Sequence, residues 1–271
     1  MKNLSTSLII IFLLLNYNLI AQDLTNVEYP ATSEEITITI GNDSIAAFAM
    51  LAAGKEKKET VILVHGLPGN ERNLDLAQDL RRNGRNVIYF NYRGAWGSQG
   101  EFLFSNLTED VKHILDFFSN PENSEKYRIQ ADSFILFGHR TGGGVALLSG
   151  AQDNRINKIA LYSPWNYGEE PKPNEEQLKE FYQYVIKPAF MLNTEQESFT
   201  EDFNSNWESF DLKQYKNKLN TMKILILDEN DRNKNWIEDI GNIEYQIMKT
   251  DHSFSNKRLE LIEIVSNWLN N

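Results

Sequence analysis

The sequence contains no cysteine among its 271 residues. This absence excludes disulfide bonds, thiolate metal sites and a cysteine nucleophile. It also excludes a lipid-modified N-terminal cysteine. Any chemistry that the protein performs must therefore come from other side chains.

Basic residues are in the minority, with 27 Lys and Arg against 38 Asp and Glu, so the formal net charge is -11. A surface that binds phosphates needs clustered Lys and Arg, and the sequence shows no basic stripe. We therefore expect no nucleic-acid partner.

The sequence also lacks a hydrophobic run long enough for an ordinary spanning helix, because the apolar run of residues 8–15 is too short. Lys2 precedes this run and the small residue Ala21 lies just before Gln22, an order typical of a secretory signal peptide. Residues 1–21 are predicted to be that peptide, and the mature protein is expected to be exported, periplasmic or extracellular, with no membrane contact after cleavage. The alternative is an uncleaved N-terminal segment that anchors the protein.

Short apolar strands alternate with amphipathic helices along the rest of the chain. A hairpin is predicted from 36–40 and 44–51, because β-branched residues alternate in the first run and "GND" forms the turn. Further strands are predicted at 60–66, 86–94, 133–138, 156–163, 221–228 and 243–249, and helices at 71–84, 107–120, 142–151 and 258–269. This alternation predicts one α/β domain with a mostly parallel eight-stranded sheet flanked by helices.

The alternation breaks once, over residues 164–221, a long acidic segment that holds eleven aromatic residues. A segment of this length inside a compact domain is rarely structureless, so we expect a small helical lid over the carboxyl edge of the sheet. Its aromatic residues either line a substrate pocket or only pack the lid on the core. The predicted organisation is a core of residues 22–163 and 222–271 with the lid inserted at 164–221.

The stretch "FILFGHRTGGG", residues 134–144, reads as a buried strand that runs through a tight turn into a helix. In many hydrolases this arrangement exposes a nucleophile, in the pattern G-x-S-x-G. Here Arg140 stands where the serine is expected, between Gly138 and Gly142.

Three other segments accompany this turn in a familiar order. They are "VHGLPGN" at 64–70, "NYRGAWGSQGEF" at 91–102, and the pair "LDENDRN" and "DHSFSNKR" that follow the last two predicted strands. Together the four segments resemble the α/β-hydrolase superfamily, particularly its small exported esterase and serine-peptidase-like members. The resemblance implies the α/β-hydrolase fold and runs from about residue 36 to the C-terminus.

The resemblance also implies roles for particular residues. The backbone N–H groups of Leu67 and Thr141 correspond to the oxyanion hole, whose donors stabilise charge in the transition state. Asp231 and His252 correspond to the acid and the base, in the family's order of nucleophile, acid and base. Asp228 is a rival acid, ranked second because it lies nearer the end of its strand.

Arg140 departs from the family pattern, because a guanidinium has no lone pair to attack an acyl carbon and stays protonated at ordinary pH. Three explanations remain open. The protein has lost or greatly reduced hydrolase activity and binds a small acyl or carboxylate ligand, with Arg140 paired to Asp231 or reaching into the anion hole. Alternatively, Asp231 and His252 act as a general-base dyad in a hydrolase or lyase, or the arginine is an accidental change in an ordinary esterase.

A role in protein interaction, through the acidic aromatic surface of the lid, is a further alternative. No spacing of His and acidic residues suggests a metal site, so we expect neither a metal nor an organic cofactor.

Overall fold

The computed structural model describes residues 28–169 and 171–271. The predicted signal peptide, residues 1–21, lies outside the described residues. In the described part of the chain, no helix combines the length and the apolar character needed to cross a membrane.

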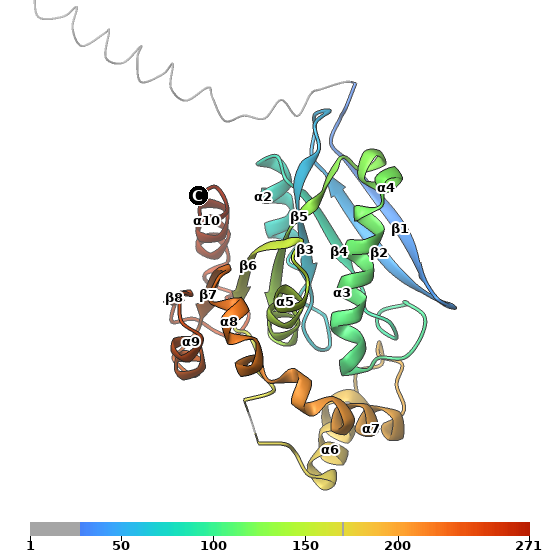
Figure 1. The fold of residues 1–271 in the computed structure, drawn as a ribbon, viewed down its shortest axis with the longest axis vertical. Helices are drawn as coiled ribbons and strands as arrows, with labels where there is room; N and C mark the ends of the chain where they lie inside the picture. Colours follow the sequence, from blue (N-terminus) through green and yellow to red (C-terminus); the bar gives the residue numbers. More distant parts are fainter. Residues whose placement is uncertain (1–27, 170) are drawn as a thin grey trace, which may run out of the picture.

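One eight-stranded sheet organises the molecule, in the order β1-β2-β4-β3-β5-β6-β7-β8 (Figure 1). The strands are β1 (Thr32–Ile40), β2 (Asp43–Leu51), β3 (Lys58–Val64), β4 (Asn86–Phe90), β5 (Ile129–His139), β6 (Ile156–Tyr162), β7 (Lys223–Asp228) and β8 (Glu244–Ile247). β2 pairs antiparallel with β1 and β4, and every other neighbouring pair is parallel. The predicted mostly parallel, eight-stranded α/β-hydrolase sheet is therefore confirmed.

Helices cover both faces of the sheet. The α-helices are α2 (Leu74–Arg82), α3 (Phe104–Ser119), α4 (Pro121–Lys126), α5 (Thr141–Gln152), α6 (Glu175–Phe181), α7 (Gln196–Asn206), α8 (Lys216–Leu219), α9 (Lys234–Ile240) and α10 (Arg258–Leu269). In Figure 1, α3 and α5 lie in front of the sheet and α2 and α10 behind it. The buried side chains of these two helix pairs belong to two separate apolar clusters, one on each face of the sheet.

Two short helices were missed by the sequence reading, and both carried a readable signal. α4 begins with Pro121 after Asn120, whose side chain accepts a hydrogen bond from the Glu122 amide and so caps the helix. α9 buries Trp236, Ile237 and Ile240, which have helical spacing, but it spans only seven residues.

The segment between β6 and β7, called the insertion here (residues 164–221), contains α6, α7 and α8. It also holds a π-helical turn (Tyr182–Ile186) and two 3-10 turns (Trp207–Phe210 and Leu212–Tyr215). Figure 1 shows α6 and α7 at the lower end of the sheet. Backbone hydrogen bonds join the insertion to the loop after β4, from the Trp96 amide to the Met191 carbonyl and from the Phe102 amide to the Asn193 carbonyl.

Register brings the chemically interesting loops to one edge. β3, β5, β6 and β7 are consecutive parallel neighbours, and Val64, Gly138 and Leu161 lie at matched positions near their carboxyl ends. Residues that follow these strands therefore meet at one edge of the sheet, where α/β proteins bind their ligands.

The turn between β5 and α5 depends on close backbone approach. A Cβ atom added to Gly142 would lie 2.1 Å from the Val64 carbonyl oxygen, and one added to Gly138 would lie 2.5 Å from the Gly142 oxygen. Neither neighbour is a flexible side chain, so the sheet and the helix would have to move apart.

Replacing Gly142 with Ala should therefore lower the free energy of unfolding by about 3 kcal/mol, even though alanine favours helices. Gly41→Ala is the control, because Gly41 has a φ of 60° but no atom within 4 Å of the added Cβ, so it should cost only about 1–2 kcal/mol. Urea denaturation measures both. Equal losses in the two variants would show that the close approach does not constrain this turn.

Candidate active site

Arg140 occupies a strained turn at the centre of the site. It joins β5 to α5 with φ 52° and ψ -119°, a backbone conformation that side chains other than glycine rarely adopt. The turn is held by the Arg140 carbonyl, which accepts hydrogen bonds from the Trp165 amide at 2.8 Å and the Gly143 amide at 3.0 Å. This is the geometry that exposes the nucleophile in α/β hydrolases, and it is retained around an arginine.

The Arg140 side chain is exposed and reaches toward the loop after β3. Its Nη1 donates to the Leu67 carbonyl oxygen at 3.3 Å. No ion pair joins Arg140 to Asp231, although both lie in the described part of the chain. The expected pairing with Asp231 is therefore not found among the described residues, and the reach of Arg140 into the anion hole stays a prediction.

Two backbone amides are predicted to form the oxyanion hole. That of Leu67 lies in the loop after β3, and that of Thr141 lies at the start of α5. Within the described residues, neither the Leu67 nor the Thr141 N–H has a hydrogen-bond acceptor. Thr141 is the first residue of α5, where backbone N–H groups have no partner inside the helix. Both amides are therefore free to donate, and their function as an oxyanion hole stays a prediction.

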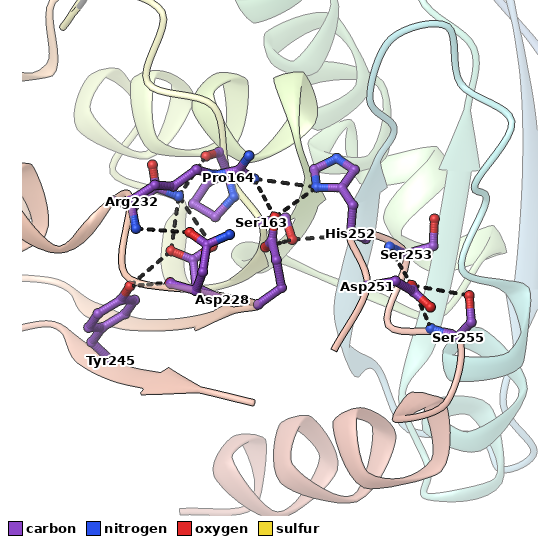
Figure 2. A network of polar contacts seen from close by, with 12 residues as sticks. Ser163, Pro164, Asp228, Arg232, Tyr245, Asp251, His252, Ser253 and Ser255 are labelled. Atoms are coloured by element: carbon purple, nitrogen blue, oxygen red, sulfur yellow. Dashed lines mark hydrogen bonds and ion pairs between the residues drawn. The ribbon is translucent and has the colours of Figure 1, made fainter. Parts of the chain in front are cut away.

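His252 lies in a network of polar contacts with residues that follow β6 and β7 (Figure 2). Its Nδ1 is 3.1 Å from Oε1 of Glu229. Nη2 of Arg232 lies 2.8 Å from the same Glu229 oxygen and 3.3 Å from His252 Nδ1. The other carboxylate oxygen of Glu229 accepts a hydrogen bond of 2.5 Å from Ser163 Oγ.

The carboxylate beside His252 thus belongs to Glu229, whereas the sequence reading placed Asp231 there. Asp231 is exposed, and its carbonyl oxygen accepts a hydrogen bond from the Lys234 amide at 3.1 Å as the chain turns into α9. Glu229 is the first residue after β7, so it stays at the sheet edge, while Asp231 lies further along the loop. A catalytic role for either carboxylate stays a prediction.

Asp228, the rival acid, is fully buried, and its hydrogen bonds are to the loop after β7 and to β8, not to the imidazole of His252. It accepts hydrogen bonds from Asn233 Nδ2 at 2.9 Å and from the Tyr245 hydroxyl at 3.1 Å. Burial raises the pKa of Asp228 to about 6, against the opposing effect of these hydrogen bonds.

Burial by itself would raise the pKa of Glu229. The hydrogen bonds from Ser163 and His252 and the positive charge of Arg232 outweigh burial, so the pKa of Glu229 lies below its ordinary value of 4.5. Glu229 is therefore an anion at neutral pH, and Arg232 and His252 share one of its oxygens.

Two further histidines near the turn are buried. The ring of His139 stacks on Tyr162, with centroids 4.2 Å apart, and lies 5.0 Å from the ring of His252. Burial, followed by the nearby charge of His252, lowers the pKa of His139 to about 3. Nδ1 of His65 is 2.8 Å from the Gly66 carbonyl, and burial lowers its pKa to about 4. Both imidazoles are neutral at pH 7 and stabilise the turn by packing.

A cavity of about 340 Å³ opens beside the turn. Two guanidinium groups, from Arg140 and Arg232, and the imidazole of His252 contribute to its wall. Asn166 also lines the cavity; it is 6% exposed, and its Oδ1 has no hydrogen-bond partner among the described residues. The carboxylate of Glu169 also lines the cavity, and Arg232 is paired with Glu229. The wall therefore holds two guanidinium groups against one carboxylate, and the unpaired Asn166 Oδ1 can accept a hydrogen bond from a donor on a ligand.

The loop after β4 is structural. Arg93 Nε lies 2.5 Å from the buried carboxylate of Asp110. Ser98 Oγ donates to the Asn91 carbonyl at 2.9 Å and accepts from the Ala46 amide at 3.0 Å. In residues 28–169 and 171–271, no group of three or more His, Asp or Glu could hold a metal ion.

The sequence reading missed Ser163, Glu229 and Arg232. Two of them could have been found from the sequence. Ser163 and Glu229 each directly follow a buried strand, and the neighbouring strands of the sheet lead to the predicted turn and to His252. Polar residues at that edge of a parallel sheet are candidates for the site by position alone.

Replacing Glu229 with Gln should lower the free energy of unfolding at pH 7 by roughly 1–2 kcal/mol, since charge-assisted hydrogen bonds are lost. The folded-state pKa is depressed, so this contribution is present above the ordinary value of 4.5 and disappears as the pH falls through the folded-state pKa. The stability of the wild-type protein and of the variant should therefore converge below pH 4.5.

Asp231→Asn, which removes the same charge from an exposed position, is the matched control and should change stability little. Denaturant unfolding at a series of pH values tests both variants. A larger effect at Asp231 than at Glu229 would contradict the network described above.

Solved structures with a similar fold are esterases and hydrolases. Est1E from Butyrivibrio proteoclasticus, solved with ferulic acid bound, matches with a TM-score of 0.65 at 14% identity, covering 86% of this chain and 97% of that chain. An esterase from Pyrococcus furiosus matches with a TM-score of 0.63 at 16% identity, covering 92% and 94%. An alpha-beta serine hydrolase homologue from Coxiella burnetii matches with a TM-score of 0.58 at 18% identity, covering 88% and 98%.

At these identities the structural matches establish the fold alone. No curated protein matches the chain by sequence. The model of the family described as serine aminopeptidase, S33, matches residues 55–220, which is more than half of the chain. The chain therefore belongs to the serine aminopeptidase S33 family of α/β hydrolases.

Proposed function

We propose that this protein keeps the site of a serine hydrolase but uses it to bind a small carboxylate or acyl ligand. In this proposal, hydrolysis through an acyl-serine intermediate is lost. The observation that carries it is the guanidinium of Arg140 at the turn where the nucleophile belongs, at the wall of the 340 Å³ cavity. A guanidinium cannot attack an acyl carbon, but it binds carboxylates well, often through two parallel hydrogen bonds.

The charges around the cavity support an anionic ligand. Arg232, which is also paired with Glu229, adds a second guanidinium to the wall, so the two guanidinium groups outnumber the one lining carboxylate, that of Glu169. The turn precedes the N-terminus of α5, a twelve-residue helix whose dipole favours negative charge at that end. The free N–H groups of Leu67 and Thr141 would add neutral donors.

The network around His252 supports binding over general-base catalysis. In a hydrolase triad the carboxylate orients the imidazole and stabilises its cationic form. Here Arg232 approaches the same Glu229 oxygen at 2.8 Å, closer than His252 at 3.1 Å. The negative charge of Glu229 is thus partly neutralised by a permanent cation, which leaves less of it to stabilise an imidazolium.

The ferulic acid bound in Est1E shows that a protein of this fold can hold an organic acid. We take this as support for the ligand class and not for the location of the ligand in this chain.

Isothermal titration calorimetry with propionate tests the binding proposal. We expect Arg140→Met to weaken binding by about tenfold to a hundredfold, the equivalent of one hydrogen bond to a charged group. Arg82→Met is the control, because Arg82 lies on α2, away from the cavity, and its removal changes the net charge equally. Equal affinity in the wild type and in Arg140→Met, or no binding by the wild type, would overturn the proposal.

A fluorophosphonate probe with a panel of acyl esters tests the loss of the nucleophile. The wild type should be neither labelled nor active. Arg140→Ser should be labelled, because in our proposal the turn, the two amides and His252 still form the rest of the hydrolase site. The double variant Arg140→Ser, His252→Ala should lose the label. Ester turnover by the wild type that His252→Ala abolishes would instead support the general-base dyad.

A further inference from the structure

We infer that the ligand of this site is a carboxylic acid that carries an aromatic group, with its carboxylate at Arg140 and Arg232 and its ring in a second cavity within the insertion. The inference rests on the proposed function and adds the chemical class of the ligand. It is carried by the second cavity, by its aromatic wall, and by one residue that belongs to both cavities.

The second cavity has a volume of about 490 Å³. Five aromatic side chains contribute to its wall, those of Trp165, Tyr167, Phe181, Phe203 and Trp207. They come from the segment after β6, from α6, from α7 and from the 3-10 turn that follows α7. The wall therefore exists only when the insertion is folded, and it is predominantly apolar.

Trp165 lines both cavities. Its amide donates to the Arg140 carbonyl at 2.8 Å, so its backbone is fixed to the turn that carries the guanidinium. Its indole is held at 60° to the ring of Tyr167, with centroids 5.2 Å apart, and at 88° to that of Phe104. The aromatic wall of the second cavity therefore begins at a residue that also lines the cavity of Arg140.

The packing of the wall favours a ring over an alkyl chain. Phe181 lies at 48° to Trp165, and Phe203 lies at 44° to Trp207. Aromatic quadrupoles attract in edge-to-face and offset-stacked arrangements, and the pair of Trp165 and Tyr167 in this wall is edge-to-face. A flat aromatic ligand can continue this arrangement, and a saturated ring of similar size gains only from burial.

The test is isothermal titration calorimetry of the full chain with four ligands. They are propionate, 3-phenylpropionate, 3-cyclohexylpropionate and 3-phenylpropanol. We expect 3-phenylpropionate to bind about tenfold or more tightly than propionate, because the ring is removed from water. We also expect it to bind several-fold more tightly than the cyclohexyl acid, and the alcohol to bind far more weakly than the acid.

The outcomes separate this inference from the function on which it rests. No binding of any acid overturns the proposed function. Equal affinity for propionate and 3-phenylpropionate leaves the carboxylate site intact and overturns the aromatic class. Equal affinity for the phenyl and cyclohexyl acids also overturns it.

Variants of the insertion locate the ring. Trp207→Ala should weaken the binding of 3-phenylpropionate by about tenfold and leave the affinity for propionate unchanged. Trp207→Phe, a milder change, should weaken the binding of 3-phenylpropionate by less. Phe190→Ala is the matched control, because Phe190 is an aromatic residue of the insertion that is 88% exposed and lies outside both cavity walls. If Phe190→Ala weakens the binding of 3-phenylpropionate as much as Trp207→Ala does, the ring does not bind in this cavity.

Discussion

The close approach of β3, β5 and α5 is the constraint on which the site depends. A Cβ atom on Gly142 would lie 2.1 Å from the Val64 carbonyl oxygen, so only glycine lets the helix begin at this distance from the sheet. The residue before the helix, Arg140, has a strained backbone conformation and an exposed side chain. The backbone therefore specifies an exposed side chain at position 140, whichever residue occupies it.

The electrostatics of the site follow from what the neighbouring strands deliver to the same edge. Ser163 follows β6 and Glu229 follows β7, and the Glu229 carboxylate has three polar partners, Ser163, Arg232 and His252. Arg140 adds a second guanidinium to the wall of the cavity, at the position where a serine hydrolase has a neutral hydroxyl. This charge at the position of the nucleophile is the basis of the anion-binding function that we propose.

The insertion makes the wall of this site from residues that are adjacent to the turn. Backbone hydrogen bonds tie the segment after β6 to Arg140 and a later segment to the loop after β4. The aromatic residues between these attachments pack on one another and on α3, as the contacts of Phe104 with Phe199 and Phe203 show. Packing of the insertion and lining of a cavity are therefore not alternatives, since the same side chains do both.

The sequence by itself determined the succession of strands and helices, the sheet class and the position of the turn, because buried strands and glycine-rich turns leave local patterns. It also determined that Arg140 cannot act as a nucleophile, which follows from its chemistry alone. Only the tertiary structure decided which acid meets His252. Asp231 and Glu229 are two residues apart in one loop, and local sequence does not reveal that the chain turns away from the imidazole after Glu229. The sharing of Glu229 by His252 and Arg232, and the lining of two cavities by Trp165, likewise depend on side chains brought together from separate parts of the chain.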